Sequence, residues 1–352
     1  MSSIILPGLI DPHVHLRDPG QTQKEDFETG TRAALAGGFT TVIDMPNNSK
    51  LIDSENLLNE KIRIARKKIV ADLGFHFGSL GNNIEHFKKV QSKVIGLKLY
   101  LSQTTGGFVH PKEQLERTFR AWGERKVILV HAEDEMLSFV IRLMGKTGNK
   151  VHICHVGKKD ELKKIIKAKE NGLKISCGVT PHYLFLTEHD AKPLGPFGKM
   201  KPPLGTKKDQ EFVWKNLEYV DLIESDHAPH TIDEKKSDNP PFGVPGLETT
   251  LPLLLNAVND KRFKIEDIVR LCYEGPKKTF ELKVHPENKV EVNLNDSFII
   301  QNRNLFTKCG WSPFAGIKVQ GKVERVYLRD KKVFEDGKIL TKPGSGHLLF
   351  PE

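Results

Sequence analysis

Hydrophobic residues follow two alternating patterns along the first two thirds of the chain. Short runs of aliphatic and β-branched residues predict strands, and longer segments with apolar residues three and four apart predict amphipathic helices. The expected strands end near Ile10, Asp44, His76, Tyr100, His131, His155, Val179 and Ser225. The expected helices include 26–35, 54–68, 112–124, 158–170 and 207–217, followed by 248–259 and 265–273.

About eight strand-helix units spread over roughly 250 residues are typical of a closed (β/α)8 TIM barrel. An open doubly wound sheet is the alternative, but no Gly-x-Gly-x-x-Gly turn follows an early strand. We therefore predict an α/β chain with a TIM barrel over 7–283. From about residue 284 the pattern changes to short strands and turns, including 298–300, 319–328 and 331–334. These predict a small C-terminal β appendage over 284–352, to which residues 1–6 add one strand.

Composition excludes several protein classes. The 352 residues are 38% hydrophobic and 28% charged, which excludes disorder as the main state. No apolar run has the length of a membrane helix, and residues 1–10 lack the features of a signal peptide. The four cysteines form no Cys-x-x-Cys pair, so we expect a cytoplasmic protein from a reducing compartment. The net charge of +9 is spread over helix-like segments without interleaved aromatic residues, which favours a solvated surface over a nucleic-acid site.

Five of the expected strands end in groups that bind metal ions. Those groups are His13 and His15, Lys98, His131, His155 and Asp226. His13 and His15 are two residues apart, so both imidazoles project to the same face. Each residue alone has a structural explanation, such as a packed histidine, a snorkelling lysine or a helix cap. Because the carboxyl ends of barrel strands converge, their coincidence favours a metal site.

Imidazole and carboxylate ligands favour zinc, or another borderline ion such as cobalt or manganese. Four histidines and one aspartate exceed what one open site requires, so we expect two ions. A lysine ammonium is a poor bridge between cations. If Lys98 reacts with carbon dioxide, the resulting carbamate (N6-carboxylated Lys98) supplies an anionic bridge.

Six motifs together carry a resemblance to a known family. They span residues 6–17 (LPGLIDPHVHLR), 45–47 (MPN), 96–100 (GLKLY), 151–155 (VHICH), 225–230 (SDHAPH) and 245–249 (PGLET). They resemble dihydroorotase, a cyclic amidohydrolase, over about residues 6–314. The chain is most similar to the dihydroorotase domain of the animal multifunctional pyrimidine protein. The resemblance implies reversible cyclisation of N-carbamoyl-L-aspartate to (S)-dihydroorotate and water in de novo pyrimidine biosynthesis.

The resemblance also implies a role for each matching residue. His13 and His15 hold one zinc ion, His131 and His155 hold the other, and carboxylated Lys98 bridges them. Asp226 binds the first zinc ion and acts as general acid and base toward a hydroxide shared by the metals. Arg17, Asn47 and His230 bind the substrate carboxylate, the backbone near Pro245 and Gly246 meets the ring, and Thr104 belongs to a mobile lid over 102–110.

Three positions depart from the family pattern. Gly178 stands where the animal domain has a glutamate linked to an additional zinc ion, so the resemblance does not extend to a third metal at Cys154. Thr105 replaces the lid phenylalanine, and Lys201 replaces an asparagine common in bacterial relatives.

Two alternative functions remain open. Another cyclic amidohydrolase, such as a hydantoinase, dihydropyrimidinase or allantoinase, shares the metals but not the substrate. A catalytically silent subunit that supports aspartate transcarbamoylase is the second alternative, although no metal ligand is missing here. Beyond its small-molecule substrate, the expected partners are a second copy in a homodimer and aspartate transcarbamoylase. We expect neither nucleic acid nor membrane as a partner.

Overall fold

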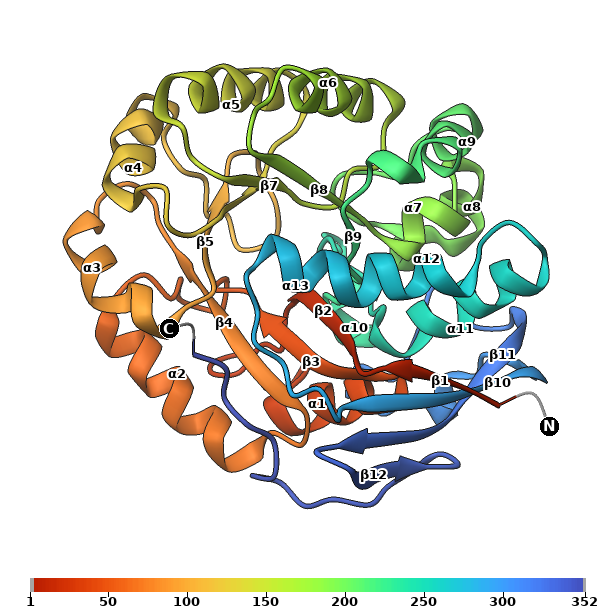
Figure 1. Ribbon diagram of the computed structural model, residues 1–352. Coiled ribbons are helices and arrows are strands. Elements are labelled where there is room, and N and C mark those ends of the chain that lie inside the picture. The colour runs from red at the N-terminus through yellow and green to blue at the C-terminus, as the bar shows by residue number, and fades with distance from the viewer. Residues whose placement is uncertain (1–2, 351–352) are drawn as a thin grey trace.

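Eight parallel strands form the central barrel of the computed structural model, which describes residues 3–350 (Figure 1). In order they are β2 (Leu9–Val14), β3 (Phe39–Asp44), β4 (Asp72–Gly78), β5 (Gly96–Tyr100), β6 (Ile128–His131), β7 (Val151–Ile153), β8 (Ile175–Val179) and β9 (Leu222–Ile223). A parallel bridge between Val14 and His227 connects the end of β2 with the segment after β9. The TIM barrel predicted from the strand-helix alternation is therefore confirmed.

Helices surround the barrel. They are α1 (Phe27–Ala36), α2 (Glu55–Lys68), α3 (Phe87–Val90), α4 (Leu115–Trp122), α5 (Asp134–Thr147), α6 (Lys159–Glu170), α7 (Pro181–Phe185), α8 (Glu188–Leu194), α9 (Lys207–Lys215), α10 (Ile232–Lys236), α11 (Leu247–Asn259), α12 (Ile265–Val269) and α13 (Gly275–Thr279). The first two begin where the sequence predicts, because the Asp26 and Ser54 side chains accept backbone N–H groups of the first helical turn. None of the helices in the described range is long and apolar enough to cross a membrane.

A second, antiparallel sheet lies beside the barrel. Its order is β1 (Ser3–Pro7), β10 (Lys289–Ile299), β11 (Lys318–Leu328), β12 (Lys331–Glu335) and β13 (Lys338–Ile339). Leu6 of β1 pairs with Val290 of β10, so the first strand joins strands from the end of the chain. Buried valines of β10 and β11 join the same hydrophobic core as α1 and α11.

Three predicted boundaries differ from the structure. β2 continues beyond Ile10 to Val14 and so carries His13 itself. β7 ends at Ile153, two residues before His155, because His155 has a φ of 42° and leaves the extended conformation. β10 begins at Lys289, well before the predicted 298, although Val290 and Val292 alternate with polar residues as in a half-buried strand.

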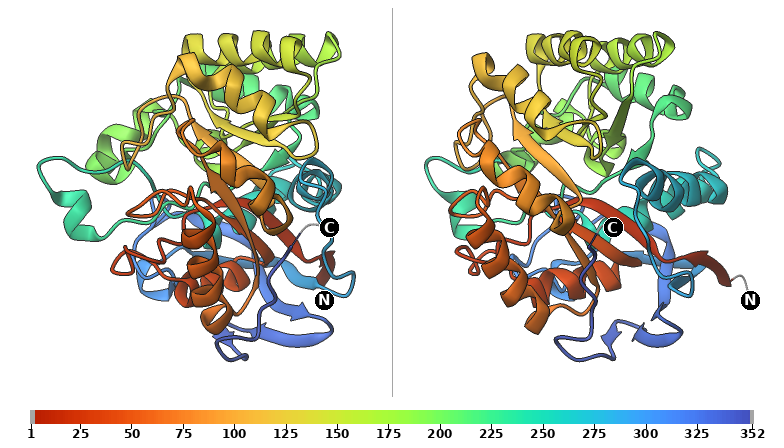
Figure 2. Two further views of the ribbon diagram at one scale, coloured as in Figure 1. Left: turned by 90° about the vertical axis from the view of Figure 1, so that its left-hand side faces the viewer. Right: turned by 60° about the vertical axis from the view of Figure 1, so that its left-hand side comes forward.

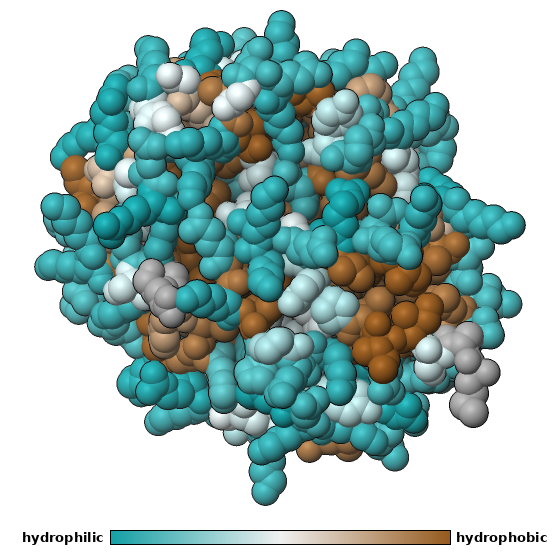
Figure 3. All heavy atoms as spheres, viewed as in Figure 1, coloured by the Kyte–Doolittle hydropathy of each residue, from teal (hydrophilic) through white to brown (hydrophobic). Residues whose placement is uncertain are grey.

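The chain ends and the segments that follow the strands lie at opposite ends of the barrel. In the side view of Figure 2 (left), both chain ends lie on one side, and the green-to-teal segments around α8 and α10 project on the other. Figure 3 looks at the side with the chain ends and shows mostly hydrophilic residues, with a hydrophobic patch near β1. The segments that follow the strands therefore gather at the opposite end.

Candidate metal and substrate site

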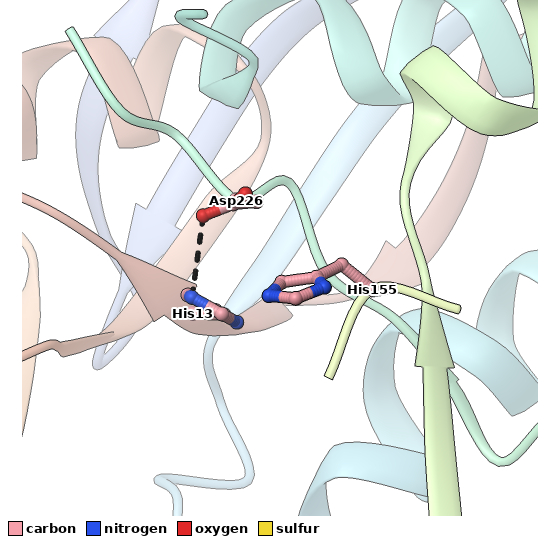
Figure 4. A group of neighbouring side chains, drawn as sticks. All are labelled: His13, His155 and Asp226. Carbon is pink, nitrogen blue, oxygen red and sulfur yellow. Dashed lines mark ion pairs between the residues drawn. The ribbon is translucent and has the colours of Figure 1, made fainter. Parts of the chain in front are cut away.

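Three predicted ligands from distant parts of the chain meet at the carboxyl ends of the strands (Figure 4). His13 lies on β2, His155 follows β7 and Asp226 follows β9. Nε2 of His13 lies 3.2 Å from Oδ1 of Asp226, and the ring centroids of His13 and His155 are 5.4 Å apart. One ligand atom from each residue lies within 4.8 Å of the other two, so the three form a group of metal-binding type.

The other two predicted histidines extend this group. Nε2 of His15 lies 3.0 Å from the same Oδ1 of Asp226, and its Nδ1 lies 2.6 Å from Oδ1 of Asn47. Nδ1 of His131 lies 3.0 Å from Nε2 of His155. All four imidazoles are buried, and together with Asp226 they form one continuous cluster.

Unusual backbone conformations orient three side chains of the site. Arg17, His155 and Asp226 have positive φ values of 62°, 42° and 45°. Such angles are uncommon outside glycine and cost on the order of 1–3 kcal/mol each, so they persist where the surrounding structure fixes them. They turn these residues out of the strand direction at the rim of the barrel.

Burial and neighbouring charges determine the protonation of the cluster. Burial would raise the pKa of the Asp226 carboxyl, but the adjacent His13, His15 and His155 outweigh it and hold that pKa well below its usual range. Burial lowers the pKa of His15 to about 3 and lowers the pKa of His155 well below its usual range. The neutral imidazoles and ionised carboxylate are the forms that bind metal ions.

Lys98 is fully buried on β5. Its Nζ lies 3.0 Å from Sγ of Cys154 and 5.2 Å from the centre of the Tyr100 ring. No carboxylate of the residues between 3 and 350 lies within ion-pairing distance of this nitrogen. A buried ammonium without an anionic partner is costly.

A small cavity of about 30 Å³ lies beside the cluster. It is lined by His15, Arg17, Asn47, Thr104, Thr105, Lys201, Asp226, Ala228, Phe242 and Gly243. Arg17 is buried there, and its Nη2 lies 3.2 Å from Nε2 of His230. The predicted carboxylate-binding residues thus lie together. Pro245 and Gly246 instead line a neighbouring cavity, where the Gly246 N–H donates to Nδ1 of His227.

Several known proteins are similar to this chain in sequence. The model of the Amidohydrolase family matches residues 4–176. The multifunctional protein CAD of Squalus acanthias is 42% identical to this chain over 345 residues. The match covers 97% of this chain and 15% of the length of CAD. The dihydroorotase of Pyrococcus horikoshii is 37% identical over 97% of this chain and 83% of its own length. This chain belongs to the dihydroorotase family.

Solved structures related to this dihydroorotase-family chain have the same fold. An L-hydantoinase from Arthrobacter aurescens superposes with a TM-score of 0.94 at 25% identity, covering 99% of this chain and 89% of the hydantoinase. An inactive dihydroorotase-like domain of the CAD-like protein from Chaetomium thermophilum gives a TM-score of 0.85 at 26% identity, covering 99% of both chains. The shared fold accommodates different substrates and inactive members, so side chains of the site must distinguish them.

Two residues of this dihydroorotase-family site are absent from the sequence prediction. Glu224 forms a second group of metal-binding type with His13 and Cys154, again within 4.8 Å. It is a charged residue at the end of an apolar strand, the same signal that identified Lys98. Lys201 lines the cavity, and its Nζ lies 3.3 Å from Oε2 of Glu133. The sequence marks Lys201 only as a departure from the family pattern.

Proposed function

We propose that this enzyme is a dihydroorotase that interconverts N-carbamoyl-L-aspartate and (S)-dihydroorotate with release or uptake of water. The observation that carries the proposal is the buried guanidinium of Arg17 in the same small cavity as His15 and Asp226. A buried cation beside the reacting groups favours a substrate with a carboxylate. Dihydroorotate has this group, and hydantoin and dihydrouracil lack it.

The donor set fits two zinc ions. His13, His15 and Asp226 would hold one ion, and His131 and His155 would hold the other. Nδ1 of His155 is buried and has no hydrogen-bond partner among the described residues, so this nitrogen is available to a cation. Carboxylated Lys98 would supply the anion between the two sites. Bound ions of this kind activate water near neutral pH and polarise an amide carbonyl.

Asp226 is the proposed general acid and base. Its side chain is 14% exposed, whereas that of His13 is 1% exposed, and it lines the cavity. His13 and His15 both lie against Oδ1, which leaves Oδ2 available to move a proton. During ring opening this oxygen delivers a proton to the departing ring nitrogen, and during ring closure it removes the proton from the attacking ureido nitrogen.

Arg17, Asn47 and His230 are the proposed carboxylate site. Nε of Arg17 donates to the Pro229 carbonyl over 3.2 Å, which fixes the plane of the guanidinium. Burial lowers the pKa of His230 to about 3, and the charge of Arg17 acts in the same direction. His230 therefore adds a neutral hydrogen-bonding group, and Arg17 supplies the positive charge that selects the substrate.

The loop 102–110 is the proposed lid. The His110 N–H donates to the Tyr100 carbonyl over 2.8 Å and closes the base of the loop, and Gly106 and Gly107 have positive φ values at its tip. The hydroxyl of Thr105 donates to the Phe242 carbonyl over 2.7 Å, across the cavity. Because the cavity holds only a few water molecules, substrate entry requires this loop to move.

The decisive test combines metal analysis with a comparison of substrates. The purified enzyme is assayed with dihydroorotate, dihydrouracil and hydantoin, and its divalent metal content is measured. We expect about two metal ions per chain and kcat/KM highest for dihydroorotate. Similar kcat/KM for dihydrouracil would assign the enzyme to the hydantoinase branch, and no turnover with a full metal complement would identify a silent subunit.

A further inference from the structure

One buried carboxylate contacts two of the proposed metal ligands. Glu224 follows β9, and none of its surface is exposed. Its Oε2 lies 3.0 Å from Nδ1 of His13, and its Oε1 accepts the backbone N–H of His155. His13 and His155 belong to different halves of the proposed metal centre. Glu224 therefore touches both halves at once.

The contact with His13 orients its imidazole. Nδ1 faces Glu224, and Nε2 faces the cluster, 3.2 Å from Asp226. A carboxylate opposite Nδ1 favours a proton on that nitrogen and leaves the lone pair of Nε2 available to a cation. It also fixes the rotation of the ring.

The contact with His155 acts on the backbone. His155 has a φ of 42°, a left-handed conformation that disfavours a residue with a Cβ atom. The hydrogen bond from its N–H to Glu224 ties this strained residue to the neighbouring segment after β9. This bond therefore helps to determine the direction in which the His155 side chain points.

Gly178 on β8 provides the space for this carboxylate. A Cβ atom at position 178 would lie 2.4 Å from Oε1 and 2.7 Å from Cδ of Glu224. Both distances are far below van der Waals contact, so any side chain at 178 would displace the carboxylate. Gly178 is needed for its lack of volume, since its φ is not in the left-handed region.

We propose that Glu224 is the positioning residue that holds His13 and His155 for the two metal ions, and that Gly178 keeps its carboxylate in place. This inference rests on the metal centre of the proposed function. It does not depend on which cyclic amide is the substrate.

The test compares two substitutions with a matched control. Glu224→Gln has one acceptor oxygen, so it can satisfy only one of the two N–H donors that the carboxylate satisfies. Gly178→Ala retains the carboxylate of Glu224 but displaces it. Glu248→Gln is the control, because Glu248 also accepts two backbone N–H groups, from Phe306 and Thr307, but contacts none of the proposed ligands.

Three measurements are independent of turnover. They are metal affinity by competition with a chelator, the visible spectrum of the Co²⁺-loaded protein, and hydrogen exchange of the His155 amide in metal-free protein. We expect Glu224→Gln and Gly178→Ala to weaken metal binding about 10- to 100-fold and to change the Co²⁺ spectrum. The His155 amide should exchange faster than in the unmodified protein. Glu248→Gln should leave all three unchanged.

Two results would overturn the proposal. One is unchanged metal affinity and an unchanged spectrum in both variants. The other is an unmodified protein that binds three ions, of which Glu224→Gln loses one and leaves the other two unaltered, because Glu224 would then be a ligand of its own ion. If Glu224→Gln does not fold, Gly178→Ala decides. If the unmodified protein binds its metal ions but does not turn over dihydroorotate, that result contradicts the proposed substrate and leaves the role of Glu224 untouched.

Discussion

Nζ of Lys98 lies 3.0 Å from Sγ of Cys154, and both side chains are buried within the barrel. A thiol neither matches the ammonium in charge nor explains a lysine in an apolar strand. Reaction with carbon dioxide would convert the buried cation into an anion on the strand that pairs with the one ending in His131. Carboxylation of Lys98 would therefore remove a buried cation and supply the anion that the proposed metal site requires.

Lys98→Ala should lose metal and nearly all activity, because the anionic bridge disappears. Small carboxylic acids that enter the vacated space should restore part of both, and the corresponding amides should not. Native mass spectrometry of the unmodified enzyme should show the added mass of one carbon dioxide. A free amine at Lys98 between two bound metal ions, in a high-resolution crystal structure, would refute the modification.

Arg17→Lys should raise KM for dihydroorotate more than tenfold and leave the metal content unchanged. A lysine ammonium cannot reproduce the two parallel hydrogen bonds of the guanidinium, and loss of such contacts costs about 1.5–3 kcal/mol. Steady-state kinetics and elemental analysis check both parts. Arg32→Lys, on the surface of α1, is the matched control and should behave as the unmodified enzyme. Equal KM values for the two variants would remove Arg17 from the carboxylate site.

Thr105→Val should raise KM about fivefold. The substitution removes the hydrogen bond from the lid to the Phe242 carbonyl, and one such bond contributes about 1 kcal/mol. Thr105→Ser retains the hydroxyl and should keep the original KM. If valine and serine give the same KM, this hydrogen bond does not hold the lid.

Glu161 should make the protein less stable as pH rises. Burial raises its pKa to about 7 from an ordinary value of 4.5, nearby Glu133 adds to the effect, and Lys158 opposes it. Below about pH 4.5 the group is protonated in both states, and the stability it contributes is lost as pH rises through about 7. The expected loss in free energy of unfolding is on the order of 1–3 kcal/mol.

Urea unfolding over this pH range tests the prediction with two variants. Glu161→Gln should flatten the pH dependence, and Glu170→Gln, an exposed position at the end of the same helix, should not. Parallel stability curves for the two variants would show that Glu161 does not titrate differently on folding.

The alternation of strands and helices predicts the barrel because each unit carries its own apolar pattern. The same reasoning places His13 and Asp226 together, since barrel strands bring their carboxyl ends to one rim. It misses Glu224, because the contacts of a side chain at a strand end depend on the empty volume at Gly178 on the neighbouring strand. Volume left by a glycine depends on register between strands, which local periodicity does not determine. The start of β10 is a different case, because the alternation of Val290 and Val292 with polar residues is local, and the sequence alone carries it.

The pairing of β1 with β10 has a consequence for synthesis of the chain. Leu6 lies opposite Val290, so β1 leaves the ribosome long before its partner strand has been made. Its edge and its isoleucines remain uncovered while the barrel units form behind it. The barrel can acquire its strands in order, but the second sheet begins to form only after β10 has followed all eight barrel strands. During that interval the nascent chain is most exposed to association with other chains and to chaperones.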